Sequence, residues 1–287
     1  MPPIISRTLR TEFRIHTESP TTYGHLRFIE ATPTLAGIDL LPVDLHVRDL
    51  DGFCALSLPN GSLVEGSASQ IISALHALVL RDLWDNEPGA PLIHGASVLV
   101  NDRRLLMVGH KGCGKTTLSL HLLMSGLALE GDEQLVVRAN EVIARPRTLR
   151  VKPGTLSLVK NVPASAWDAP TIEAWDGTLI RAVSPAISGR EWQIGAGPLG
   201  AIIFLVANHG GRSIARALSA EGAFQRLMGE TLMPAAGIGA AAGRLRRLVL
   251  DTPCFELMLG DLATAEWHIN KIAGLLTASP VAGSMQS

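Results

Sequence analysis

The chain has 287 residues, of which 47% are hydrophobic and 18% charged, and its formal net charge at pH 7 is −1. A chain of this length and composition can fold as a globular protein with a substantial buried core. Its near-zero net charge provides no general attraction to nucleic acid or to anionic lipid, so neither is an expected partner.

Residues 1–20 carry charges and prolines where a signal peptide needs an apolar core. No run of about 18 apolar residues, the length that spans a membrane, occurs in the sequence. The three cysteines, Cys54, Cys113 and Cys254, are far apart and form no CxxC pair, which indicates neither a disulfide framework nor a zinc site. We therefore expect a cytoplasmic protein without a membrane-spanning segment.

Short strands are expected in the N-terminal part of the chain. Residues 43–48 (VDLHVR) alternate between apolar and polar side chains, and residues 53–58 follow the same pattern less regularly. Asp51-Gly52 between them is typical of a hairpin turn, and a third strand is expected at 62–65. The pattern predicts a small β-rich sheet.

A helix is predicted over residues 68–84, because its apolar residues recur at helical spacing and Ser67 or Ser69 can serve as N-cap. The turn-forming stretch at 85–89 follows it and is the most plausible domain boundary. The predicted organisation is a small N-terminal α/β region (1–90), a second domain (91–277) and a flexible tail (278–287).

An apolar strand pair precedes a glycine-rich loop. Strands are expected at 96–100 and 104–108 with a turn at 101–103, and the second strand runs directly into the loop. A helix is expected at 116–125, closed by Gly126. Residues 160–195 give no clear pattern. Later expected elements are strands at 134–138, 201–206 and 254–259, and helices at 221–232, 235–248 and after an Asp261 cap.

Residues 109–117, GHKGCGKTT, carry the Gly-x4-Gly-Lys-Thr pattern of a nucleotide-binding P-loop between a strand and a helix. Glycine lets backbone N–H groups approach a phosphate, and the following helix presents its positive end to the same anion. Lys115 is expected to reach the β- and γ-phosphates of ATP, and the Thr116 hydroxyl to bind Mg²⁺. The alternative is a glycine-rich turn that only connects strand to helix. The predicted cofactor-binding residues are Gly109, Gly112, Cys113, Gly114, Lys115, Thr116 and Thr117.

Two adjacent acids, Asp132 and Glu133, follow the next apolar run, residues 127–129. If that run is a strand parallel to the one before the P-loop, its end delivers both carboxylates to the loop. One acid can then bind Mg²⁺ through water, and the other can accept a proton from an attacking hydroxyl or water. Two neighbouring carboxylates also repel, which should raise the pKa of one of them. The alternative is an acidic, solvated turn.

His94 lies fifteen residues before Gly109, and a lone histidine is more often structural than catalytic. The whole stretch from His94 to Glu133, however, resembles the HPr kinase/phosphorylase family. A His-Gly pair, two short strands, the P-loop, a helix ending at glycine and an acidic pair follow in that family's order and spacing. The resemblance covers roughly residues 91–275.

The most similar branch is that of HPr-kinase-related proteins from modified-peptide gene clusters of the lasso-peptide type. In that branch the acidic pair is Asp-Glu, as here, and a Pro-Arg…Lys segment follows, which corresponds to Arg145-Pro146-Arg147 through Lys152-Pro153 in this sequence. The N-terminal region resembles this branch only loosely.

This resemblance implies an α/β fold whose main part is a P-loop kinase domain of the HPr kinase/phosphoenolpyruvate carboxykinase type. It also implies ATP- and Mg²⁺-dependent phosphorylation of a serine hydroxyl, on a ribosomal precursor peptide or another small protein. Asp132 would be the general base, Glu133 an acid on the metal side with Thr116, and His94 a group near the transferred phosphate. Lys152 becomes a candidate phosphate contact.

Two features depart from the family: the acidic pair is not Asp-Asp, and residues 155–163 contain no glutamate. They argue against a reverse, phosphate-removing activity, and the N-terminal region and later loops argue against HPr as the acceptor. A second hypothesis is a non-kinase NTPase that acts as a nucleotide-dependent switch or scaffold. A pseudokinase is a third, opposed by the presence of Lys115, Thr116 and Asp132. The identity of the acceptor and assembly into a homo-oligomer remain open.

Overall fold

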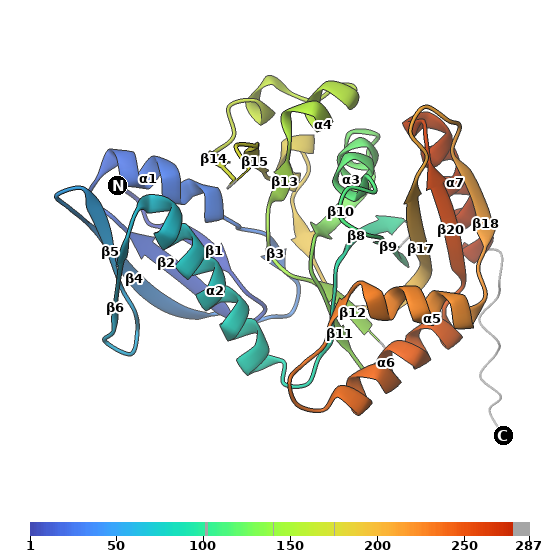
Figure 1. Cartoon of the computed structure of the whole chain (residues 1–287), viewed down its shortest axis with the longest axis horizontal. Coiled ribbons are helices and arrows are strands. Elements are labelled where there is room, and N and C mark those ends of the chain that lie inside the picture. Colours follow the sequence, from blue (N-terminus) through green and yellow to red (C-terminus); the bar gives the residue numbers. More distant parts are fainter. Residues whose placement is uncertain (101–102, 140, 175, 278–287) are drawn as a thin grey trace.

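The computed structural model describes residues 1–100, 103–139, 141–174 and 176–277. The fold is mixed α/β, as predicted, with several β-sheets and helices packed on them (Figure 1). Part of the turn predicted at 101–103 and the whole tail predicted at 278–287 lie outside the described residues. No helix within the described residues is long and apolar enough to cross a membrane.

The N-terminal region is a five-stranded sheet with a long helix packed against it (Figure 1). The hairpin predicted at 43–48 and 53–58 is present, and Gly52 in its turn has φ +86°. The helix predicted over 68–84 also forms, and the Ser67 side chain caps it by accepting from the N–H of Gln70. The sequence patterns missed the first two strands and the first helix. In sheet order the strands are β1 (Ile4–Arg7), β2 (Thr11–His16), β4 (Leu41–Leu50), β5 (Phe53–Ser57) and β6 (Leu63–Gly66); the helical segments are α1 (Pro20–Leu26), η1 (Arg27–Ile29) and α2 (Ala68–Asn86).

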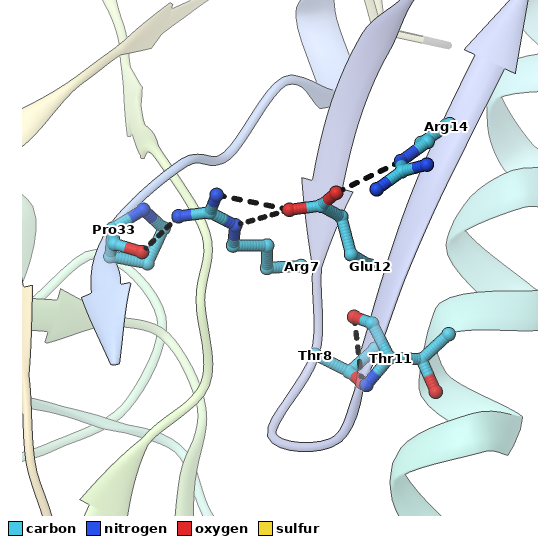
Figure 2. A network of polar contacts seen from close by, with 6 residues as sticks. All are labelled: Arg7, Thr8, Thr11, Glu12, Arg14 and Pro33. Carbon is cyan, nitrogen blue, oxygen red and sulfur yellow. Dashed lines mark hydrogen bonds and ion pairs between the residues drawn. The ribbon is translucent and has the colours of Figure 1, made fainter. Parts of the chain in front are cut away.

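A charged network ties the first hairpin to the segment that leaves the sheet (Figure 2). The Glu12 carboxylate on β2 accepts hydrogen bonds from Arg7 and from Arg14, each at 3.0 Å. The Arg7 guanidinium also donates to the carbonyl oxygen of Pro33 at 2.7 Å, just before the short strand β3 (Thr34–Leu35). The side chains of the hairpin therefore fix the course of the chain toward the second region.

A six-stranded sheet forms the centre of the second region. In sheet order its strands are β10 (Ala128–Asp132), β8 (Gly95–Val100), β9 (Arg103–Val108), β17 (Leu199–Ala207), β20 (Cys254–Leu259) and β18 (Ile214–Ala217). The strands predicted at 96–100, 104–108, 201–206 and 254–259 are all among them. β10 pairs antiparallel with β8, which pairs antiparallel with β9, so β10 runs in the direction of β9 and ends at the same edge.

Helices cover one face of this sheet, and helices with a second sheet cover the other. These helices are α3 (Lys115–Met124), α5 (Ala220–Gly229), α6 (Ile238–Asp251) and α7 (Leu262–Thr277). Leu105 of β9 lies in one buried cluster with Leu118 of α3 and Ile269 of α7. Its neighbour Leu106 lies in another, with Leu245 of α6, because successive strand residues point to opposite faces.

Smaller sheets complete the second region. A four-stranded sheet contains β12 (Glu141–Ala144), β11 (Leu135–Arg138), β7 (Leu92–Ile93) and β19 (Thr231–Leu232). A three-stranded sheet contains β13 (Leu149–Val151), β15 (Leu179–Val183) and β14 (Thr171–Glu173), next to α4 (Pro153–Leu158), η2 (Ala164–Ala166) and η3 (Pro185–Ser188). Strand β16 (Gln193–Ile194) pairs in parallel with β3 of the N-terminal region.

The structure corrects two sequence expectations and assigns a segment that gave no clear pattern. The helix predicted at 221–232 ends at Gly229, because Thr231 and Leu232 pair with β7 instead. The helix predicted at 235–248 is shifted toward the C-terminus, and residues 160–195 contain strands β14, β15 and β16. The domain boundary near residue 90 stays a prediction. Contacts cross it: β3 pairs with β16, and Ala182 of β15 packs into the N-terminal core.

Candidate nucleotide-binding and catalytic site

The predicted P-loop connects the end of β9 to the start of α3, as the sequence pattern requires. Gly112 and Gly114 have φ of +91° and +98°, a conformation that side-chain-bearing residues rarely adopt. A Cβ on Gly109 would lie 2.8 Å from the carbonyl oxygen of Leu205, and one on Gly114 would lie 2.6 Å from Cδ2 of Leu259. Glycine is therefore required at 112 and 114 by the turn of the loop, and at 109 by the close approach to the backbone of β17.

Replacing Gly109 by alanine should displace the loop, because its Cβ has no room beside the backbone of β17. We expect a loss of about 1–3 kcal/mol in the free energy of unfolding, measured by urea denaturation, together with weaker ATP binding. Gly154→Ala in α4 is the matched control, since a Cβ there meets nothing within 4 Å. Equal effects of the two substitutions would contradict the close packing of the loop.

Lys115 lies inside the loop and is only 6% exposed. Its ammonium group donates to the carbonyl oxygen of Gly109 and, at 3.2 Å, to that of His110. Cys113 is buried beside it, and burial raises the pKa of its thiol. The charge of Lys115 opposes this increase but burial is the larger cause, so Cys113 stays a protonated thiol that fills space in the loop.

Asp132 ends strand β10 and reaches the loop. Its Oδ2 accepts a hydrogen bond of 2.7 Å from the Thr116 hydroxyl. Within the described residues its Oδ1 has no hydrogen-bond partner. Burial raises the pKa of Asp132 from 3.8 to about 6, the Thr116 hydrogen bond opposes this increase, and the charge of Glu133 adds to it. The expected repulsion between the two acids thus acts on Asp132, although burial is the larger cause.

The Glu133 carboxylate forms an ion pair with Arg147. Its backbone has φ +91°, which is strained for a residue with a side chain. Two contacts hold it there: its N–H donates to the carbonyl oxygen of Gly95 at 2.7 Å, and its own carbonyl oxygen lies 3.1 Å from Nδ1 of His94. The acid on the Thr116 side of the site is therefore Asp132, and the predicted metal role of Glu133 stays a prediction.

His94 lies at the site because its Nδ1 contacts the carbonyl oxygen of Glu133. Burial, and next the positive charge of Lys115, lower the pKa of His94. Because a carbonyl oxygen only accepts, Nδ1 carries the proton in this contact and Nε2 of the neutral ring is unprotonated. The structure thus places all three predicted catalytic residues, Asp132, His94 and Lys115, at one edge of the central sheet.

The segment that contains Lys152 also lies beside the loop. The Thr155 hydroxyl of α4 is 3.1 Å from the hydroxyl of Thr117 on α3. Lys152 itself is exposed at the start of α4, and its predicted phosphate contact stays a prediction. The sequence gives no signal for a site role of Arg147, because its contact with Glu133 depends on how β12 packs beside β10.

The chain was compared with known proteins. No protein-family model matches it, and no curated protein matches it. Among solved structures it is similar to the HPr(Ser) kinase/phosphatase from Coxiella burnetii, with 13% sequence identity and a TM-score of 0.31. The similarity covers 63% of this chain and 97% of that one.

Proposed function

We propose that the protein is an ATP-dependent serine kinase with a P-loop kinase domain of the HPr kinase-like type. The observation that carries the proposal is the Thr116–Asp132 hydrogen bond, which joins a buried carboxyl to the P-loop pattern. Raised to about 6, the pKa of this carboxyl is close to that of an efficient general base at neutral pH.

The residues present fit ATP and Mg²⁺. The glycines leave room for a phosphate at the N-terminus of α3, and Lys115 is held where its ammonium can turn from two carbonyl oxygens to phosphate oxygens. Thr116 and Asp132 supply oxygen atoms of the kind that Mg²⁺ prefers, to be completed by phosphate and water. When bound, ATP supplies the transferable phosphoryl group and Mg²⁺ neutralises its charge.

Asp132 can act both as a general base for the acceptor hydroxyl and as a ligand near Mg²⁺. Its Oδ2 stays on the Thr116 hydroxyl, while Oδ1 accepts the proton that leaves a serine hydroxyl. Neutral His94, fixed by the backbone of Glu133, is proposed to lie near the transferred phosphate. The acceptor would be a serine in a peptide or small protein, such as a lasso-peptide-type precursor.

The proposal is tested by incubating the protein with ATP, Mg²⁺ and serine-containing peptides and weighing the peptides by mass spectrometry. A mass increase of one phosphate on serine, absent with Asp132→Asn, is the expected result. ATP turnover that survives in Asp132→Asn and yields no phosphorylated product would instead favour the nucleotide-dependent switch. Neither turnover nor transfer with any peptide would contradict both.

A further inference from the structure

Three arginines lie close to Glu133: Arg145 and Arg147 on the chain between β12 and β13, and Arg150 in β13. Arg145 is 5% exposed and donates to the side-chain oxygen of Gln134. Arg147 pairs with Glu133. Arg150 donates to the carbonyl oxygen of Phe28 at 2.7 Å, and its guanidinium lies 3.7 Å from the centre of the Phe28 ring. Arg145, Arg147 and Arg150 are called the arginine cluster below.

The charge of the arginine cluster is not balanced by its neighbours. Within the described residues Glu133 is the one carboxylate that forms an ion pair with any of the three. His76 of α2 lies 3.2 Å from Arg150, but burial and the arginine charges lower its pKa to about 2, so it is a neutral acceptor. Buried charges are costly unless they are paired. The cluster therefore has an excess of positive charge, which a bound anion would neutralise.

The cluster also has unused hydrogen-bond donors. The Nε atoms of all three arginines are buried and, within the described residues, have no hydrogen-bond partner. The buried hydroxyl of Thr148, between Arg147 and Arg150 in the sequence, has none either. The planar donor fork of a guanidinium matches the oxygen atoms of a carboxylate or a phosphate.

The arginine cluster lies next to the reacting groups. Glu133, the partner of Arg147, directly follows Asp132, and the positive charge of Arg147 acts to lower the pKa of Asp132. The Arg147 and Glu133 side chains are 19% and 36% exposed, so this end of the cluster is open to solvent. The Arg150 end is covered by Phe28 and His76 of the N-terminal region. An anion bound at Arg147 would thus lie close to the proposed base.

We propose that the arginine cluster is a second anion-binding subsite, which takes a carboxylate or phosphate group that the acceptor carries near its hydroxyl. This inference rests on the proposed kinase activity and names its substrate class: a serine with an anionic neighbour. Glu133 is the internal counter-ion that the anion of the acceptor displaces from Arg147.

Binding is tested with inorganic phosphate, titrated calorimetrically into protein that holds Mg²⁺ and a non-hydrolysable ATP analogue in the P-loop. We expect one phosphate per chain, with affinity at least about tenfold weaker in Arg147→Gln and several-fold tighter in Glu133→Gln. Arg138→Gln is the matched control, because it also breaks a partly buried Arg–Glu pair, with Glu87, and should change nothing. A structural Arg147–Glu133 pair would not tighten phosphate binding when Glu133 is neutralised.

Transfer is tested with matched peptides in which the serine is followed by a free terminal carboxylate or its amide, or is flanked by aspartate, phosphoserine or a neutral residue. We expect a KM at least about tenfold lower for the anionic member of a pair, with this preference lost in Arg147→Gln. The pair that shows the preference identifies the source of the anion.

The two proposals fail in different ways. Phosphate binding without transfer to any peptide would overturn the kinase but leave the anion subsite. No phosphate binding, or equal KM values for anionic and neutral peptides, would overturn the subsite proposal even if transfer occurs. Thermal unfolding of each variant verifies that a loss of binding does not come from a loss of fold.

Discussion

Replacing Asp132 by asparagine should greatly slow phosphoryl transfer and, at the same time, stabilise the nucleotide-free protein at neutral pH. Loss of a general base lowers the transfer rate by about 100- to 10,000-fold. The buried carboxylate accepts one hydrogen bond from Thr116, but burial destabilises its charged form. The pKa of Asp132, raised to about 6, shows that this destabilisation is the larger effect. Removing that charge in a side chain of the same shape should raise the free energy of unfolding by about 1–3 kcal/mol.

The gain in stability should depend on pH in a defined sense. The ordinary pKa of the Asp132 carboxyl is 3.8, and in the fold it is about 6. Below about pH 4 both the folded and the unfolded chain hold the proton, so Asp132 does not lower the free energy of unfolding there. Between about pH 4 and 6 the unfolded chain releases the proton first, so the contribution of Asp132 to stability falls as the pH rises, and it is constant above. The difference in Tm between Asp132→Asn and the wild type should grow over this interval and then level off.

Two results would contradict this account. A variant that is less stable than the wild type at pH 7 would mean that Asp132 is held mainly by favourable contacts. A stability difference independent of pH would mean that the carboxyl does not titrate with a raised pKa. The measurement is thermal unfolding of both proteins from pH 4 to 7.5 without nucleotide or metal ion.

The sequence predicted the part of the site that depends on local chain geometry. A strand, a glycine-rich loop and a helix are consecutive in the chain, and the glycines at 112 and 114 are needed by the backbone of the loop itself. The same holds for the hairpin at Gly52 and for the helix that begins at Ser67, where turn and cap residues specify the structure within a few positions.

The sequence could not tell which of the two acids faces the loop. Asp132 and Glu133 are adjacent, but Asp132 ends strand β10 and the backbone turns at Glu133, which has φ +91°. Their assignment depends on the pairing of β10 with β8, in which Asp132 lies opposite Ala96, far earlier in the chain. In the structure Asp132 contacts Thr116 and Glu133 contacts Arg147. The charge pattern of the sequence does not predict which acid makes which contact.

Long-range contacts also explain the misplaced elements. Thr231 and Leu232 continue the helical pattern of α5 in the sequence. In the structure they pair with strand β7, and this tertiary contact outweighs their local helix propensity. The arginine cluster is the strongest example: Arg150 meets Phe28 and His76, which lie more than seventy residues away in the chain. Residue composition gave no reason to bring these groups together.

Replacing Lys115 by methionine should remove ATP binding while leaving the fold in place. Methionine keeps the apolar stem that lies buried in the loop, and the lost ammonium group is the one that would contact the phosphates. We expect ATP affinity, measured calorimetrically, to fall at least about 100-fold. Lys111→Met on the exposed side of the same loop is the control and should change affinity by less than about twofold, because an exposed charge contributes little. Equal losses would mean that the loop attracts ATP by its general charge, and ATP turnover in Lys115→Met would contradict both the kinase and the switch.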